Sequence, residues 1–333
     1  MSTRVLSVFI ILINIIYCAA NGIFGAILYS DWIKCDHTKV FNLNVDDTQV
    51  FFYDFQNNYN LTSKIDLASH VITSTYNLDT TRKLIVFVPG YKSHISRSAA
   101  EIVRTAFKDI PNIYLMILDH SEYTSSKGGR IKSYERAVLH AYYIGRALGN
   151  LLVEFRSKGI LPANMQLLGH SLGAHMIGYA AETYTDRTGE TISRLTGIDP
   201  AGPCFSNDFI ENQLRKGLAD YVEVYHCNAG GLGSTSVLAD TDFFINNGRV
   251  QRECSTWLDI SDSAKCSHKA CLKYWAETVN NPKYYLAWAC DSYEDFSGGK
   301  CSGNKVTIGG YSNPGNETGV FYISTDMYRL RKL

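Results

Sequence analysis

Ser171 lies at the centre of the sequence GHSLG (residues 169–173), with a glycine two positions away on each side. An apolar run at residues 165–168 precedes this pentapeptide, and a segment of small and apolar residues (174–181) follows it. This order predicts a strand, a sharp turn that carries the serine, and a helix, whereas the pentapeptide alone also fits a glycine-rich loop with a capping serine. Glycine suits both flanking positions because a strained turn crowds the residues two positions away. The hydroxyl would lie at a helix N-terminus, where negative charge is favoured, which indicates a nucleophile that forms an oxyanion.

A serine becomes an effective nucleophile when a base takes its proton and a carboxylate orients that base. In α/β-hydrolase folds these partners follow the serine in the order acid, then histidine. We predict Asp199 as the acid, because it ends an apolar run and the proline-rich sequence after it continues neither strand nor helix. The alternative is that Asp199 only caps a proline turn. Competing acids further along the chain are Asp220, Asp240 and Asp242.

Two histidines well downstream of the predicted acid, His226 and His268, are candidates for the base. His226 ends a predicted strand, where a structural role would suffice. We favour His268 and expect it in a loop before a helix-like segment (residues 269–279), because a loop pinned by a disulfide suits a base that reaches across to the sheet. The oxyanion needs two donors, which we assign to the backbone N–H of Leu172, after the nucleophile, and that of Tyr91, after an early strand.

The elements that must position these residues alternate along the chain. Apolar runs predict strands at residues 84–88, 114–119, 165–168, 195–199 and 221–226, and alternating residues suggest short antiparallel strands near 50–53. Helical patterns occur at 96–108, at 137–155 and after the serine. This alternation predicts an α/β fold with a mainly parallel central sheet and helices on both faces. Reactive groups collect at the carboxyl ends of such strands, where Tyr91, Ser171 and Asp199 all fall.

Composition limits the class of protein. The 333 residues are 45% hydrophobic, enough for a large core, and the 32 basic and 32 acidic residues balance, so no long-range field would recruit nucleic acid. Residues 1–20 are typical of a secretory signal peptide, which predicts a secreted, extracellular mature chain of one domain (residues 21–333). The alternative is an uncleaved anchor that continues to Leu28, and no other stretch is suited to span a bilayer.

Export agrees with two further features. Removal of the signal peptide would leave eight cysteines, an even number that predicts disulfides without fixing their pairing. Two sequons predict glycosylation at Asn60 and Asn316.

Metal and cofactor chemistry fit this sequence poorly. His170 and His175 are five residues apart, which does not place two imidazoles on one helical face. A zinc site at Cys266, His268 and Cys271 is an alternative, but disulfides are favoured in an exported chain. Rossmann and P-loop glycine patterns are missing, so we expect neither a metal nor a cofactor.

Together these segments resemble the animal neutral lipase family, which includes pancreatic, lipoprotein, hepatic and endothelial lipases and the secreted phospholipases A1. The matching segments follow the family's order and cover about residues 80–325: QLLGHSLGAH (166–175), LTGIDPAGP (195–203), DFFINNG (242–248), CSH (266–268) and GVFY (319–322). The resemblance implies an α/β-hydrolase fold with Ser171, Asp199 and His268 as the catalytic triad.

The resemblance also implies two disulfides, Cys254 with Cys266 at the base of the family's lid and Cys290 with Cys301. It leaves three pairings open for the remaining cysteines, which are Cys35, Cys204, Cys227 and Cys271.

The chain departs from the family at two places. Pro89-Gly90 stands where the family usually has His-Gly before the oxyanion residue, which leaves the shape of that loop open but keeps the Tyr91 N–H available. The chain also ends shortly after residue 322, so we expect it to lack the C-terminal β-sandwich of the larger members and to bind no colipase.

Lid length indicates the substrate. Eleven residues separate Cys254 from Cys266, with Trp257, Leu258 and Ile260 as the apolar contacts, and so short a lid buries little surface. Within the family such lids resemble those of the phospholipases A1, including insect venom enzymes. The resemblance therefore implies hydrolysis of the sn-1 ester of a phospholipid at a lipid–water interface, with triacylglycerol as the alternative substrate. A non-catalytic lipid-binding or storage protein is a further alternative, although such relatives lose the serine.

Overall fold

The structure is a computed structural model that describes residues 35–37, 43–125, 130–205, 210–255, 260–301 and 305–326. The predicted signal peptide and the predicted lid residues Trp257 and Leu258 lie outside these ranges. The strands in chain order are β1 (Gln49–Asp54), β2 (Tyr59–Lys64), β3 (Lys83–Val88), β4 (Ile113–Asp119), β5 (Met165–His170), β6 (Arg194–Ile198), β7 (Tyr221–His226), β8 (Thr241–Ile245), β9 (Tyr285–Ala289), β10 (Val306–Gly309) and β11 (Gly319–Ile323).

These strands form one sheet in the order β10-β9-β11-β8-β7-β6-β5-β3-β4-β1-β2. The seven strands from β11 to β4 run parallel to their neighbours, and antiparallel strands extend both edges. The sheet confirms the predicted α/β class and the antiparallel pair near the N-terminus. Because the parallel strands point the same way, the loops that follow β3, β5, β6 and β7 meet at one edge of the sheet.

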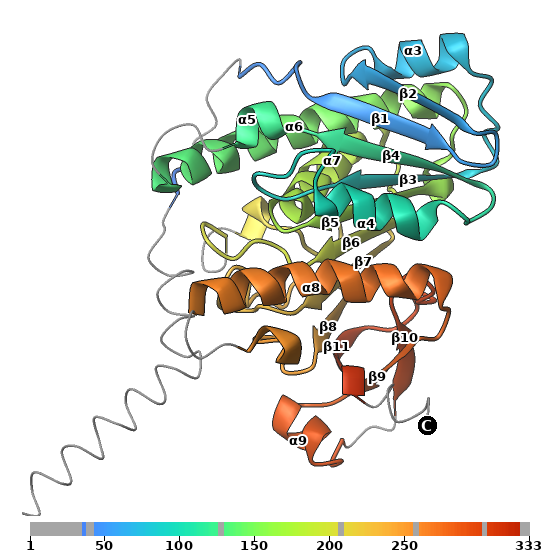
Figure 1. Cartoon of the computed structure of the whole chain (residues 1–333). Coiled ribbons are helices and arrows are strands. Elements are labelled where there is room, and N and C mark those ends of the chain that lie inside the picture. Colours follow the sequence, from blue (N-terminus) through green and yellow to red (C-terminus); the bar gives the residue numbers. More distant parts are fainter. Residues whose placement is uncertain are drawn as a thin grey trace, which may run out of the picture.

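Helices cover both faces of the sheet (Figure 1). They are α3 (Ala68–Thr75), α4 (Ser98–Phe107), α5 (Ser121–Thr124), α6 (Arg130–Ser157), α7 (Leu172–Thr188), α8 (Ile260–Asn280) and α9 (Tyr293–Ser297). One core cluster joins the sheet to α3, α6 and α7, and a second joins its other face to α4 and α8. None of the helices among the described residues combines the length and apolar character needed to cross a membrane.

The start of α8 differs from the sequence prediction. We expected His268 in a loop, but α8 begins at Ile260 and His268 lies in its third turn. Residues 260–267 contain no proline or glycine, and the buried residues Ser263, Ser267 and Cys271 recur every four residues, which is a helical spacing. The closely spaced cysteines therefore join a helix to the chain before it and do not mark a loop.

Candidate active site

Ser171 lies in the sharp turn between β5 and α7. Its backbone angles, φ 57° and ψ −123°, are strained for a residue with a side chain. A Cβ on Gly169 would lie 2.4 Å from the Gly173 carbonyl oxygen, and a Cβ on Gly173 would lie 2.1 Å from the Val88 carbonyl oxygen at the end of β3. Both glycines are therefore required by contacts with backbone, and the second presses the turn against the neighbouring strand.

Asp199 directly follows β6 and is fully buried. Its Oδ1 accepts hydrogen bonds from the amides of Cys227 (2.7 Å) and Asn228 (3.0 Å), and its Oδ2 accepts one from His268 Nδ1 at 2.5 Å. The loop after β7 packs directly on this carboxylate, since a Cβ on Gly233 would lie 2.6 Å from Oδ1. Three donors thus fix the direction of the carboxylate toward the imidazole.

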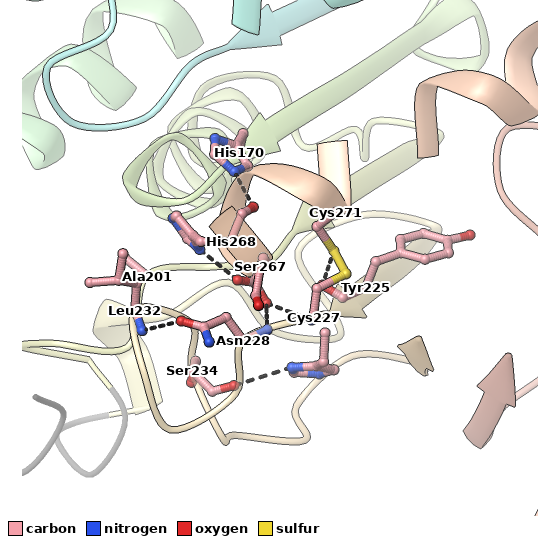
Figure 2. A network of polar contacts seen from close by, with 12 residues as sticks. His170, Ala201, Tyr225, Cys227, Asn228, Leu232, Ser234, Ser267, His268 and Cys271 are labelled. Atoms are coloured by element: carbon pink, nitrogen blue, oxygen red, sulfur yellow. Dashed lines mark hydrogen bonds and ion pairs between the residues drawn. A yellow bond between two sulfur atoms is a disulfide. The ribbon is translucent and has the colours of Figure 1, made fainter. Parts of the chain in front are cut away.

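His268 is held from both its ring and its backbone (Figure 2). Nδ1 is bound to Asp199, which leaves Nε2 as the ring nitrogen able to accept a proton. The His268 carbonyl oxygen accepts a hydrogen bond from Nε2 of His170 at 3.1 Å. Burial and the neighbouring His268 lower the pKa of His170 to about 3, so His170 is neutral and must carry its proton on Nε2.

A disulfide ties the segment around Asp199 to the helix that carries His268. Cys227, whose amide binds Asp199, is bonded to Cys271, one turn after His268 on α8. A second disulfide joins Cys35 to Cys204. These two bonds settle the pairing of the four cysteines that the sequence left open. The structure also contains the two pairs implied by the resemblance, Cys254 with Cys266 and Cys290 with Cys301.

The competing acids and the competing base have other partners. His226 is buried and its Nε2 lies 2.8 Å from Asp242. Asp240 accepts the amide of Val222 at 2.9 Å, and Asp220 accepts the hydroxyl of Thr191. Among the described residues, Asp199 is the carboxylate that binds the His268 imidazole.

The loop after β3 approaches the serine closely. A Cβ on Gly90 would lie 2.7 Å from the Ser171 Cβ, so only glycine permits this approach. The next amide, Tyr91 N–H, has no acceptor among the described residues. Leu172 is the first residue of α7, and the first N–H groups of a helix have no acceptor within the helix. Both predicted oxyanion donors are therefore available beside the serine.

A cavity of about 610 Å³ lies above these residues, between α4 and α8. Ser171 and His268 line it together with the apolar side chains of Ala99, Ile102 and Leu272. Its lining also includes four cations, Lys92, Arg97, Lys265 and Lys269, and no carboxylate among the described residues. Lys265 pairs with Asp262 at 3.0 Å, and the other three cations form no ion pair with a described residue. The cavity thus combines an apolar trough with positive charge.

The remaining predicted residues are the two sequon asparagines and Ile260. Asn60, in the edge strand β2, and Asn316, before β11, are both exposed. Ile260 begins α8. In the described part of the chain, no group of three or more His, Cys, Asp or Glu side chains is arranged to hold a metal.

Sequence reasoning missed Gln251, which is buried behind the site. Its side-chain NH₂ donates to the carbonyl oxygens of Cys227 (2.9 Å) and Ile245 (3.1 Å). Its backbone N–H donates to the Ser267 hydroxyl at 3.0 Å. Gln251 thereby joins the loop that holds Asp199 to the helix that carries His268. No local sequence signal marks it, because its partners come from three separate elements.

Comparison with known proteins identifies the family of this chain. A model of the protein family described as Lipase matches residues 25–324. Pancreatic triacylglycerol lipase of Sus scrofa is 28% identical over 308 residues, which cover 84% of this chain and 66% of that protein. Lipase member H-B of Xenopus laevis is 29% identical over 242 residues, covering 72% of this chain and 51% of that protein. The chain spans between about half and two-thirds of the length of these curated relatives.

Among solved structures, Est1E from Butyrivibrio proteoclasticus with bound ferulic acid is similar over 48% of this chain and 53% of that chain, with 15% identity and a TM-score of 0.30.

Proposed function

This chain belongs to the Lipase family, and on that premise we propose that it is a serine hydrolase of lipid carboxylic esters. Ser171 is the nucleophile, His268 the general base and Asp199 the residue that orients the base. The observation that carries the proposal is the 2.5 Å hydrogen bond from His268 Nδ1 to the buried Asp199. His268 and Ser171 line the same cavity. A buried carboxylate, an oriented imidazole and a serine on a strained turn are the parts that acyl transfer requires.

The proposed reaction proceeds in two steps. Ser171 Oγ attacks the ester carbonyl while His268 Nε2 takes its proton, and the N–H groups of Leu172 and Tyr91 stabilise the oxyanion. His268 returns the proton to the leaving alcohol as the carbon–oxygen bond breaks, which leaves an acyl group on Ser171. A water molecule, deprotonated by His268, then releases the fatty acid and restores the serine.

We propose the sn-1 ester of a phospholipid as the preferred substrate. The apolar wall of the cavity suits an acyl chain. Lys92, Arg97 and Lys269, which form no ion pair with a described residue, offer positive charge to a head-group phosphate. A triacylglycerol carries no charge and would gain nothing from these side chains, so it remains the alternative. The short spacing between Cys254 and Cys266 supports the same choice.

We also propose that the chain is exported and acts outside the cell, as one domain over residues 21–333. The apolar N-terminal segment and the four disulfides support export, because disulfides persist in oxidising compartments. The exposure of Asn60 and Asn316 makes both sequons accessible to glycosylation.

The test combines labelling with product analysis. A fluorophosphonate probe should modify Ser171 in the wild-type chain and nothing in Ser171→Ala, as mapped by mass spectrometry. With phosphatidylcholine and triolein in matched vesicles and emulsions, we expect faster fatty acid release from the phospholipid. Absence of both label and hydrolysis would favour a storage or binding protein, and equal or greater release from triolein would reverse the order of substrates.

The variant Arg97→Gln tests the role of positive charge in this choice. It removes one cation from the cavity without touching the three proposed catalytic residues. The ratio of phospholipid to triolein hydrolysis should fall several-fold, about 1 kcal/mol for a charge-assisted contact. An unchanged ratio would remove the argument from charge.

A further inference from the structure

The loop that carries Tyr91 is held by the last residue of β4 and the residues that follow it. This segment, residues 119–124, binds the loop at three points: His120 Nε2 to the Pro89 carbonyl oxygen (2.9 Å), Thr124 carbonyl oxygen to the Lys92 N–H (3.1 Å) and Asp119 Oδ2 to the Ile95 N–H (2.9 Å). In two of these contacts the segment supplies the acceptor, the Thr124 carbonyl oxygen or the Asp119 carboxylate. The contact nearest the serine uses the imidazole of His120.

The protonation of His120 is fixed by its surroundings. The side chain is fully buried, and burial lowers its pKa, so the ring is neutral. A carbonyl oxygen only accepts hydrogen bonds, so the proton lies on Nε2, facing Pro89. Nδ1 then accepts from the Thr124 hydroxyl, 2.8 Å away. His120 is therefore a fixed donor in one tautomer.

The acceptor, Pro89, has only one polar backbone group. Proline lacks an N–H, so its carbonyl is the one group through which the backbone at this position is hydrogen-bonded. This carbonyl lies against the serine turn, because a Cβ on Gly173 would be 2.6 Å from its oxygen. Rotation of the Pro89–Gly90 peptide would turn the next peptide, whose N–H belongs to Tyr91.

We propose that His120 is a positioning residue, which sets the direction of the Tyr91 N–H in the oxyanion hole by binding the Pro89 carbonyl. This inference rests on the proposed function, since it requires that an oxyanion forms beside Ser171. It assigns a purpose to a buried histidine that the triad does not use. It also explains how a loop with proline at position 89 is held in place.

The main test compares His120→Leu with His120→Gln. Leucine removes the donor, and kcat should fall about 10- to 100-fold, somewhat less than for loss of a whole oxyanion donor, with KM nearly unchanged. Glutamine can offer an amide N–H to Pro89 and should recover most of this loss. A boronic acid that mimics the tetrahedral intermediate should lose affinity in His120→Leu by a factor similar to that of kcat/KM.

The control is His70→Gln. His70 lies on the exposed surface of α3, outside both the 119–124 segment and the loop that carries Tyr91. Its replacement should leave kcat and boronic acid affinity within about two-fold of wild type. If His120→Leu folds poorly, Thr124→Val provides a milder variant, since it removes the hydroxyl bound to Nδ1 of His120 and should lower kcat about 2- to 10-fold at constant KM.

Two outcomes would overturn the inference in an active wild-type enzyme. One is a His120→Leu or Thr124→Val variant whose kcat and boronic acid affinity match those of the control. The other is a failure of glutamine to recover kcat in a variant with a wild-type melting temperature. An inactive wild-type chain that is not labelled at Ser171 would instead contradict the proposed function, so the two failures are distinguishable.

Discussion

At the scale of single residues, the site depends on where protons are placed. Asp199 receives three hydrogen bonds and has no solvent exposure, so its two oxygens have separate tasks. One oxygen is held by the amides of Cys227 and Asn228, and the other faces the imidazole. The direction of the carboxylate is thus determined by backbone, and the tautomer of His268 is determined by the carboxylate.

The variant Asp199→Asn tests this division. An asparagine oxygen can still accept the amides of Cys227 and Asn228, but its NH₂ would face the Nδ1–H of His268, which favours the wrong tautomer. We expect kcat to fall about 10⁴-fold in a folded protein. Steady-state kinetics with circular dichroism checks this, and Asp220→Asn at the surface is the control. A loss below about ten-fold would contradict the assigned role.

Residues whose role is encoded locally could be predicted from the sequence. Ser171 lies between two glycines, and Asp199 lies between an apolar run and a proline, so both signals span a few positions. The supporting contacts could not be predicted, because they join distant positions. His170 and His268 are 98 residues apart in the chain, and His120 and Pro89 are 31 apart. No short pattern in one sequence records such a pair.

At the scale of elements, α8 and the loop after β7 form one unit. The disulfide between Cys227 and Cys271 fastens the loop to the helix. Gln251 bridges the same two parts, since its side chain donates to the Cys227 carbonyl oxygen and its backbone N–H donates to the Ser267 hydroxyl. Apolar runs predicted the strands from β3 to β7, but β8 to β11 were not predicted as strands. The start of α8 was predicted wrongly, because the pattern of cysteines suggested a loop where the residue types permit a helix.

Removal of this disulfide should affect catalysis more than stability alone explains. The double variant Cys227→Ser, Cys271→Ser loosens the helix that carries His268, and we expect kcat to fall about ten-fold at a temperature where the protein is folded. The matched control is Cys290→Ser, Cys301→Ser, a disulfide outside the site. Both should lose about 2–4 kcal/mol of unfolding free energy. Equal kcat values in the two variants would contradict a positioning role for the first disulfide.

At the scale of the whole molecule, buried histidines tie the catalytic edge of the sheet together. His170 donates to the base helix, and His175 donates to the Ala201 carbonyl oxygen (2.9 Å) after the acid. Burial lowers the pKa of His170 to about 3 and that of His175 to about 4. His175 Nδ1 accepts the amide of Leu214 at 3.2 Å, so its protonation would break a native hydrogen bond. Both side chains are therefore neutral in the folded protein throughout the mildly acidic range.

This arrangement predicts that acid destabilises the fold between about pH 6 and pH 4. In the unfolded chain both histidines bind protons below about pH 6.5, whereas the folded chain binds them only near pH 3–4. The unfolded state therefore gains protons first, and the free energy of unfolding falls as pH decreases. Each histidine contributes a slope of about 1.4 kcal/mol per pH unit between pH 6 and 4. The two together contribute about 2.8 kcal/mol per pH unit.

Urea unfolding at pH 7, 6, 5 and 4.5 measures this slope. In His175→Gln the absolute stability will differ, but the slope below pH 6 should decrease by about 1.4 kcal/mol per pH unit, because one proton no longer distinguishes the two states. His70→Gln, on the exposed surface of α3, is the control and should keep the wild-type slope. If wild type and His175→Gln have the same slope, His175 is not held neutral by the fold, and another group causes the acid sensitivity.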